Sequence, residues 1–186
     1  FGNLYLGPIY YYFMALPLWL AGFDPSGPAF MVAGFGILTI FLVWKLAWDF
    51  LSPKAAWVAA LLYAVSPLVI NHTRSSWNPN PMPFFSILAI YSLLKMAKEK
   101  DGRWLIVVGA SLGIAFQLHY IAMAFIAVVA ILLLFLRARI AIGWYLAGFA
   151  SFLALLSLQI LFELRHNFIN TQAMLSFFFG KNEFET

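Results

Sequence analysis

The sequence of 186 residues contains no cysteine and few charged residues. The lack of cysteine excludes a disulfide-bonded scaffold and any reaction that depends on a thiolate. Charged residues make up only 10% of the chain, whereas a soluble domain carries about 25%. Because so few charges cannot cover a surface that faces water, the chain is not an ordinary soluble globular domain. The net charge of +4 does not indicate nucleic-acid binding, since the basic residues lie in short connections between apolar segments.

Hydrophobic residues, in contrast, make up 64% of the chain, and the mean hydropathy is +0.90. A chain of this composition needs lipid as the solvent for much of its length. The sequence therefore predicts an all-α fold, a polytopic integral membrane helix bundle that occupies residues 1–186 as a single transmembrane domain. The chain begins at Phe1 with no signal-peptide pattern, and we expect it to be truncated at both ends.

Apolar runs of roughly the length of a membrane span, about 17–25 residues, recur along the chain. They predict spans over residues 29–51, 55–71, 82–98, 104–119, 120–136 and 140–162. A single helix over 104–136 would be roughly 50 Å long at about 1.5 Å per residue. This exceeds a hydrocarbon core of about 30 Å, and we therefore place a turn near residues 117–120.

The basic residues are divided unequally between alternate connections. One set of connections holds Lys45, Lys54, Lys95, Lys98, Lys100, Arg103, Arg137 and Arg139, whereas the other holds Arg74, Arg165 and Lys181. By the positive-inside rule, the richer set faces the cytoplasm. The loop 72–81, the turn near His119 and the tail 163–186 then share the outer side.

The first apolar run, about residues 8–22, contains Pro17 and opens with three tyrosines after Ile9. It is short for a span, and a span here would conflict with the orientation derived from the basic residues. We therefore predict an interfacial juxtamembrane helix on the outer face. A short, tilted span is the alternative.

The longest polar connection, residues 72–81, is rich in Pro and Asn, which favour turns. Arg74 is its only permanent charge, and the planar donor fork of a guanidinium suits phosphate or carboxylate. Alternatively, Arg74 snorkels to lipid headgroups. His119 is either a hydrogen-bonded structural residue or a substrate contact or base beside Arg74. Arg165 and His166 either anchor the last span or contact the substrate.

Several signatures of enzyme chemistry are absent, among them a phosphate-binding glycine loop, a metal-ligand spacing and a nucleophile elbow. A metal-dependent reaction requires carboxylates, and the outer side carries few. The residues therefore predict no metal site and no cofactor. Glycines are predicted to let helices pack closely at Gly34, Gly36, Gly109 and Gly113.

Residues 7–12, Gly-Pro-Ile-Tyr-Tyr-Tyr, resemble a signature of GT-C-type membrane glycosyltransferases. The relevant branch includes the protein O-mannosyltransferases and the lipid A aminoarabinose transferase. In that family the motif lies on a juxtamembrane helix in the first extracytoplasmic loop. Ser-Pro at 66–67, followed by Thr-Arg at 73–74, resembles the passage that enters the second outer loop of the family. The similarity runs in order over about residues 2–136.

The resemblance implies an inverting, mannosyltransferase-like glycosyltransferase that moves a sugar from a polyprenyl-phosphate-linked donor to a lipid, glycan or protein acceptor. The reaction would take place on the extracytoplasmic face of a bacterial or archaeal plasma membrane. The family's first-loop carboxylate, the general base, would lie upstream of Phe1. At a second position where the family often has Asp, this chain has Pro79. The candidate substrate-binding residues are Arg74, His72, Asn78, Asn80, Tyr10, Tyr11, His119, Arg165 and His166.

Within this scheme Arg74 would stabilise the departing phosphate. No cofactor is evident, although the resemblance allows a divalent metal, and the partners would be the sugar donor, the acceptor and membrane lipids but no nucleic acid.

Two other classes of protein remain open. A transporter or flippase for a lipid-linked or small substrate would have polar residues near the bilayer midplane and internal repeats. A non-catalytic scaffold subunit would change in assembly, and not in turnover, when Arg74 is replaced.

Overall fold

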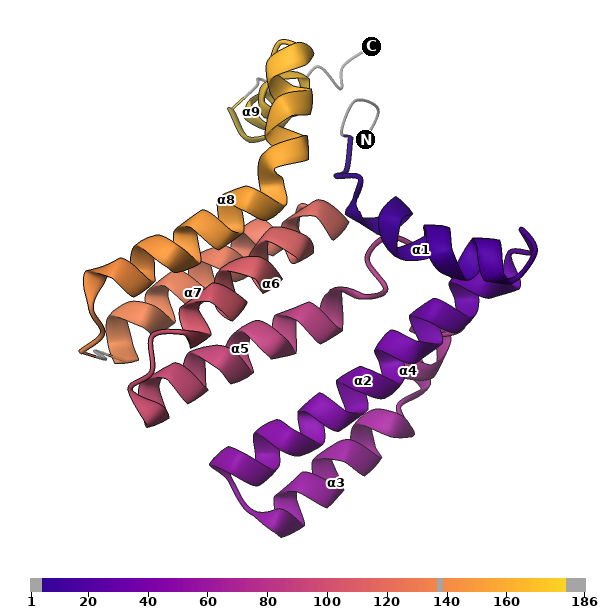
Figure 1. Cartoon of the computed structure of the whole chain (residues 1–186). Coiled ribbons are helices and arrows are strands. Elements are labelled where there is room, and N and C mark those ends of the chain that lie inside the picture. The colour runs from indigo at the N-terminus through magenta and orange to yellow at the C-terminus, as the bar shows by residue number, and fades with distance from the viewer. Residues whose placement is uncertain (1–4, 137–138, 180–186) are drawn as a thin grey trace.

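The structure, a computed structural model, describes residues 5–136 and 139–179, the last three by their backbone alone. Within these ranges every regular element is an α-helix (Figure 1). The helices are α1 (Ile9–Leu20), α2 (Ser26–Phe50), α3 (Pro53–Ala64), α4 (Pro67–His72), α5 (Met82–Glu99), α6 (Trp104–Leu118), α7 (Ala122–Leu136), α8 (Ile142–Arg165) and α9 (Ile169–Phe179). The predicted all-α fold is thereby confirmed.

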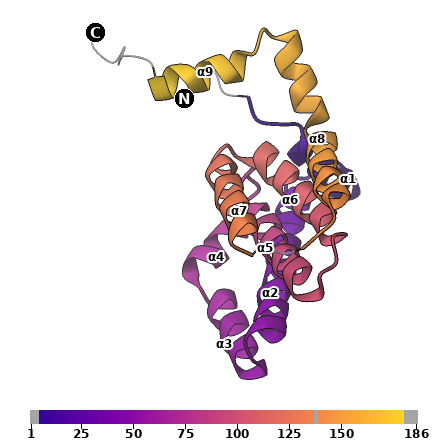
Figure 2. The same cartoon turned by 90° about the vertical axis from the view of Figure 1, so that its left-hand side faces the viewer.

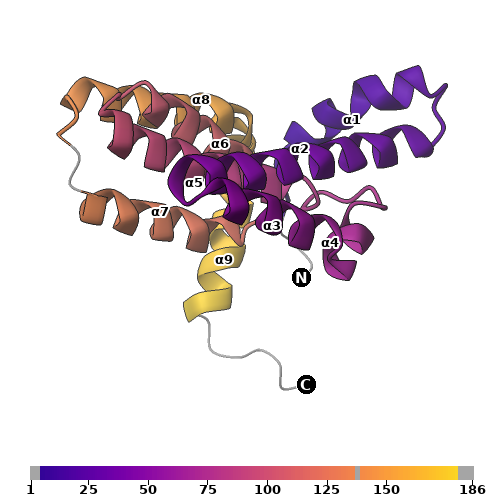
Figure 3. The same ribbon diagram turned by 90° about the horizontal axis from the view of Figure 1, so that it is seen from below.

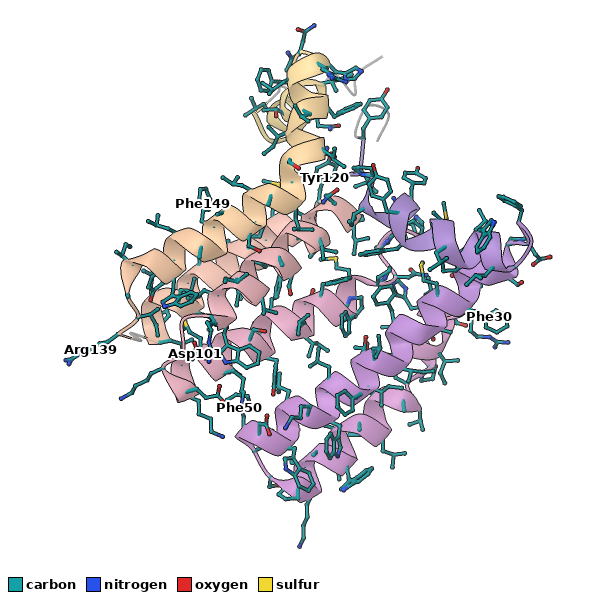
Figure 4. The ribbon with its side chains drawn as sticks, viewed as in Figure 1. Phe30, Phe50, Asp101, Tyr120, Arg139 and Phe149 are labelled. Carbon is teal, nitrogen blue, oxygen red and sulfur yellow. The ribbon has the colours of Figure 1, made fainter. Side chains whose placement is uncertain are left out.

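The surface of the bundle is apolar, as a lipid environment requires. Phe30, Leu134 and Phe135 have exposed fractions of 76%, 77% and 78%, and Figure 4 shows Phe30 and Phe149 pointing away from the helices. Helices α2, with 25 residues, and α8, with 24, are long and apolar enough to cross a membrane. Because water would not tolerate this much exposed apolar surface, the chain is an integral membrane helix bundle.

Two helices, α6 and α2, form the frame of the bundle. Helix α6 packs most extensively against α8 and α5, and α2 packs against α3, α1 and α5. Figure 3 shows α7 on the opposite side of α6 from α8, and an apolar cavity of about 240 Å³ is lined by residues of these three helices. The main buried cluster joins α5, α6 and α7 and consists of Ala89, Leu93, Met96, Leu105, Val108, Leu112 and Val129.

Glycines set the closest helix contact, as the sequence predicts for Gly109. A Cβ atom at Gly109 would lie 1.9 Å from the carbonyl oxygen of Gly148, so α6 and α8 meet backbone to backbone. At Gly36 a Cβ atom would lie 2.5 Å from Cγ2 of Thr73. Gly34 has no described atom within 4 Å of such a Cβ, and the packing role predicted for it is wrong.

The apolar run 55–71, predicted to be one span, is divided between two helices, α3 and α4, and its crossing of the membrane stays a prediction. Pro67 has no backbone N–H to continue a helix, and it disfavours helical geometry in the residue before it. Ser66 accordingly has φ −64° and ψ 121°, and Pro67 takes the first position of α4. The break turns the end of this segment back over α2, which places Thr73 against Gly36.

The α6–α7 and α8–α9 connections also change the direction of the backbone. Helices α6 and α7 are separated by a turn in which His119 is extended, with φ −164° and ψ 138°. Helix α8 continues to Arg165, and Asn167 and Phe168 then adopt positive φ angles of 53° and 59°. Helix α9 therefore turns away from α8 (Figure 2), so the predicted outer tail is partly helical.

The helix ends form two opposite ends of the bundle. The α2–α3, α5–α6 and α7–α8 connections lie at one end, here called the basic end, and α1, the α4–α5 loop and the α6–α7 turn lie at the other, the polar end (Figure 1). At the basic end Lys45 pairs with Asp49 at 2.8 Å, and Arg103 pairs with Asp101 at 2.8 Å. Arg137 and Lys181 lie outside the described residues.

Candidate functional site

The loop 73–81 at the polar end is tied to α1 by Tyr10, one of the predicted site residues. The Tyr10 hydroxyl and Ser76 Oγ lie 2.6 Å apart and form a hydrogen bond. Tyr10 is only 3% exposed, and burial raises its pKa, an effect that the hydrogen bond to Ser76 opposes. Tyr10 is therefore a neutral anchor for the loop, whereas Tyr11 is 58% exposed.

Hydrogen bonds within the loop hold its backbone on both sides of Arg74. The hydroxyl of Thr73 donates to the carbonyl oxygens of Val69 at 2.9 Å and Ile70 at 3.1 Å. After Arg74, the carbonyl oxygen of Ser75 accepts a 2.5 Å hydrogen bond from Asn80 Nδ2. The backbone conformation of the loop is thus held by hydrogen bonds from the side chains of Thr73 and Asn80.

The Arg74 side chain itself is exposed, and its guanidinium makes no ion pair or hydrogen bond with any residue that the structure describes. Such a group presents up to five N–H donors in a plane, which matches the oxygens of a phosphate or carboxylate. Asn78 is partly exposed nearby in the sequence, on the same loop. The loop 73–81 therefore presents the positive charge of Arg74 to an anion from a backbone that is already held in place.

Beneath the loop lies a cavity of about 370 Å³, here called the α2–α5 cavity. It is lined by Gly36, Thr39, Tyr63, Leu68, Val69, His72, Thr73, Asn80 and Pro83. The cavity brings together His72 and Asn80, which the sequence placed in the site, with Thr39 and Tyr63, which it did not. A polar residue within an otherwise apolar span is the signal that singles out Thr39.

His119 has a structural role in the α6–α7 turn. Its Nδ1 atom accepts a hydrogen bond of 3.1 Å from the backbone N–H of Ile121. The neutral ring therefore carries its proton on Nε2. His119 is not among the described residues that line the α2–α5 cavity, and the role beside Arg74 stays a prediction.

A second polar network at this end was missed by the sequence analysis. The backbone of Tyr5 donates to Asn170 Oδ1 at 2.6 Å, and its carbonyl oxygen accepts from Gln159 Nε2 at 3.2 Å and from the Tyr120 hydroxyl. Gln117 Nε2 donates to the Leu155 carbonyl oxygen at 2.6 Å. Gln159 stands out only as an amide within an apolar helix, and such buried amides in membrane helices need partners.

Arg165 and His166 lie at the end of α8, and neither lines the α2–α5 cavity. His166 Nδ1 is 2.8 Å from the carbonyl oxygen of Phe162, and the two rings stack with centroids 4.1 Å apart. Arg165 is exposed. The two alternatives for the pair, an anchor of the last span or a substrate contact, both stay predictions.

The described carboxylates of the polar end are both engaged. Asp24 accepts from the backbone N–H of Ser26 at 2.8 Å, and hydrogen bonding to Ser26 lowers the pKa of Asp24. Glu163 accepts from the N–H of Thr171 at 3.0 Å and from its hydroxyl at 2.8 Å. No group of three or more His, Asp or Glu residues suited to a metal ion occurs in residues 5–136 and 139–176. The base upstream of Phe1 and the divalent metal stay predictions.

The described residues thus form an apolar helix bundle with a structured polar loop at its polar end. A family model described as dolichyl-phosphate-mannose-protein mannosyltransferase matches residues 6–178. The chain belongs to this family, and the resemblance inferred from the sequence motifs is confirmed. Comparisons with curated proteins and with solved structures give no significant match.

Proposed function

We propose that the protein transfers a sugar from a polyprenyl-phosphate donor to an acceptor hydroxyl or amine on the extracytoplasmic face of the membrane. Arg74 carries this proposal, because its guanidinium is unpaired among the described residues while the backbone around it is fixed by Thr73 and Asn80. The family match favours a transferase over the transporter and scaffold alternatives.

The reaction is an inverting substitution at the anomeric carbon. The acceptor nucleophile forms a bond to that carbon, the bond from carbon to phosphate oxygen breaks, and the polyprenyl phosphate leaves with the electron pair. The proton of the acceptor passes to a general base, a carboxylate that we expect upstream of Phe1. Arg74 stabilises the negative charge that grows on the phosphate, and this charge is larger in the transition state than in the bound donor.

The orientation of the bundle follows from its charges. The basic end carries most of the lysine and arginine residues and faces the cytoplasm, so the polar end faces outward. On the outer surface of α1, Tyr11, Tyr12 and Trp19 have exposed fractions of 58%, 58% and 64%. Aromatic rings with polar tips favour the headgroup level of a bilayer, which supports an interfacial position for α1 beside the headgroup of the donor.

The test compares Arg74→Ala with Arg139→Ala in the full-length protein in proteoliposomes. Arg139 is an exposed arginine at the basic end (Figure 4), so its replacement removes the same charge from the other side. With polyprenyl-phosphate mannose as donor, we expect Arg74→Ala to lower kcat about 10²–10³-fold, as the loss of one transition-state donor does. Arg139→Ala should retain the activity of the wild type.

Each alternative predicts a different result. Normal transfer by Arg74→Ala removes Arg74 from the mechanism. Movement of a labelled lipid-linked sugar across the bilayer, with no new glycosidic bond, favours the transporter or flippase. If Arg74→Ala changes the assembly of a complex while the wild type shows no turnover of its own, the chain is a scaffold subunit.

A further inference from the structure

Gln117 is a buried amide near the end of an apolar helix, and α8 fixes its orientation. Its exposed fraction is 2%, and its Nε2 atom donates to the carbonyl oxygen of Leu155 on α8 at 2.6 Å. A buried amide in a membrane helix needs such a partner. Because a carbonyl oxygen can only accept, the hydrogen bond places the amide nitrogen at α8. The Gln117 side chain is therefore held between α6 and α8.

The backbone of Gly7 rests on this side chain. The N–H of Gly7 donates to the carbonyl oxygen of Gln117 at 3.2 Å, which lies in the last turn of α6, where carbonyls lack a partner within the helix. A Cβ atom at Gly7 would lie 2.4 Å from Cγ of Gln117 and 2.6 Å from its Oε1. Cβ atoms essentially never approach another heavy atom within 3.0 Å. Only glycine therefore fits at position 7 while Gln117 stays bonded to Leu155.

Helix α1 begins directly after this contact, with Pro8 as its N-cap residue. Tyr10, in the first turn of α1, packs in one buried cluster with residues of α6, and its hydroxyl lies 2.6 Å from Ser76 Oγ. Figure 1 shows α1 extending from the end of α6 across the polar end towards α2. A continuous series of contacts thus runs from α8 through α6 and α1 to the loop 73–81.

This loop is held from two sides, and Arg74 lies between them. On one side the Thr73 hydroxyl bonds to carbonyl oxygens of α4, and on the other side Ser76 bonds to α1. A shift of α1 therefore moves the backbone two residues from Arg74.

We propose that Gly7 and Gln117 are positioning residues for the proposed transfer. They seat α1 on α6 and α8, and α1 in turn sets the position of Arg74. A displacement of about 1 Å can lower the rate of a reaction about 100-fold, so a small error in the seat of α1 is enough to matter. The inference rests on the proposed function, because it requires that Arg74 takes part in the transfer.

Two variants disturb the seat of α1 in the full-length protein. Gly7→Ala introduces the Cβ atom that does not fit, whereas Gln117→Met keeps an unbranched side chain and removes the amide that bonds to α8. In proteoliposomes with polyprenyl-phosphate mannose as donor, we expect Gly7→Ala to lower kcat about 10–100-fold. Gln117→Met should lower kcat about fivefold, the scale of one lost hydrogen bond.

Two further variants serve as matched controls. Gly143→Ala also adds a methyl group, but no described atom lies within 4 Å of a Cβ at that position. Ser151→Ala removes a different side-chain bond between α8 and α6, from Ser151 Oγ to the carbonyl oxygen of Ile106 at 3.0 Å. Both variants should keep the kcat of the wild type, because neither change bears on the seat of α1.

The Arg74→Ala background separates a positioning role from a general loss of folded protein. If the two residues act through Arg74, then Gly7→Ala and Gln117→Met should have no further effect on kcat once Arg74 is removed. Misfolding would instead lower kcat by the same factor in both backgrounds, and this result would overturn the inference.

Hydrogen exchange over residues 73–80 tests the same contacts without any turnover. Gly7→Ala and Gln117→Met should speed exchange there, whereas Ser151→Ala should not. Unchanged exchange in both variants would overturn the inference and leave the proposed function standing. Faster exchange in the variants of a protein whose wild type transfers no sugar would refute the proposed function, although α1 would still hold the loop. Should Gly7→Ala not fold, Gln117→Met decides both tests.

Discussion

The contact between α6 and α8 should fail when one methyl group is added at Gly109. An ideal Cβ atom there lies 1.9 Å from the carbonyl oxygen of Gly148 and 3.2 Å from the backbone nitrogen of Phe152. Both obstacles are backbone atoms, so the two helices must separate as rigid bodies. Overpacking of a well-packed core costs about 1–3 kcal/mol, and we expect Gly109→Ala to reach the upper value, about 3 kcal/mol.

The assay is thermal unfolding of the purified protein in detergent, followed by circular dichroism at 222 nm. At about 2–4 °C per kcal/mol for a chain of this size, Gly109→Ala should lower Tm by about 6–12 °C. Gly34→Ala is the matched control, because no described atom lies within 4 Å of a Cβ at that position. Alanine is the better helix former by about 1 kcal/mol, so this control should keep or raise the Tm.

Equal Tm values for the two variants would refute this reasoning. They would mean that α6 and α8 do not approach each other at Gly109 and that the broadest helix interface of the bundle is built differently. A reduced Tm in both variants would indicate a general intolerance of added volume, and would also contradict the open surroundings of Gly34.

Three further predictions concern the polar end. A double-mutant cycle of Tyr10→Phe and Ser76→Ala should give a coupling of about 0.5–1.5 kcal/mol in the free energy of unfolding; additive effects would contradict the hydrogen bond. Burial, with a smaller effect of the Glu163 charge, raises the pKa of Tyr120 from 10.0 to about 12, so its contribution to stability is complete below pH 10 and is lost as the pH rises towards 12. Tyr120→Phe should therefore lose less stability than the wild type over that interval, with tyrosinate absorbance as the check. Glu163→Ala removes the acceptor for the N–H of Thr171 and should speed hydrogen exchange over residues 169–176; unchanged exchange would show that α9 does not depend on this cap.

Composition and length determine much of the architecture before any contact is known. A chain with only 10% charged residues requires an apolar environment, and the length of its apolar runs then predicts helices. Length separates α6 from α7, since one helix over 104–136 would exceed the hydrocarbon core. The motif at residues 7–12 can be recognised from the sequence alone, because its resemblance to the family does not depend on how the helices pack.

The helix break at Ser66 and Pro67 and the open surroundings of Gly34 have physical causes that cannot be read from the pattern of apolar residues. Hydropathy runs smoothly through Ser66 and Pro67, so the break between α3 and α4 is visible only in the backbone restrictions of proline. Gly34 and Gly36 are alike in sequence, but they lie about 200° apart around a helix with roughly 3.6 residues per turn. Only Gly36 meets another element. Which of two nearby glycines packs is decided by a neighbour that is distant in the sequence, here Thr73.

The candidate site shows the same limit more strongly. Asn78 and Asn80 are the same residue type in the same loop. Asn80, however, is buried and donates a hydrogen bond to the carbonyl oxygen of Ser75, while Asn78 is partly exposed. Likewise, the network around Tyr5 joins residues that are 154 and 165 positions apart. Long-range pairings of this kind depend on the assembled bundle, and single-sequence reasoning has no access to them.

Among the described residues, the ion pairs lie at the basic end of the bundle. Some of the cations there pair with a local carboxylate, as in Lys45–Asp49 and Arg103–Asp101, whereas Lys54 and Arg139 pair with no described residue. At the polar end, Arg74 has no acidic partner in the described part of the chain, and the carboxylate of Glu163 is occupied by α9. An exposed guanidinium held on a closed loop at an apolar interface gains most from an external anion. The fold thus leaves a positive charge available at the end where the phosphate of a lipid-linked donor would enter.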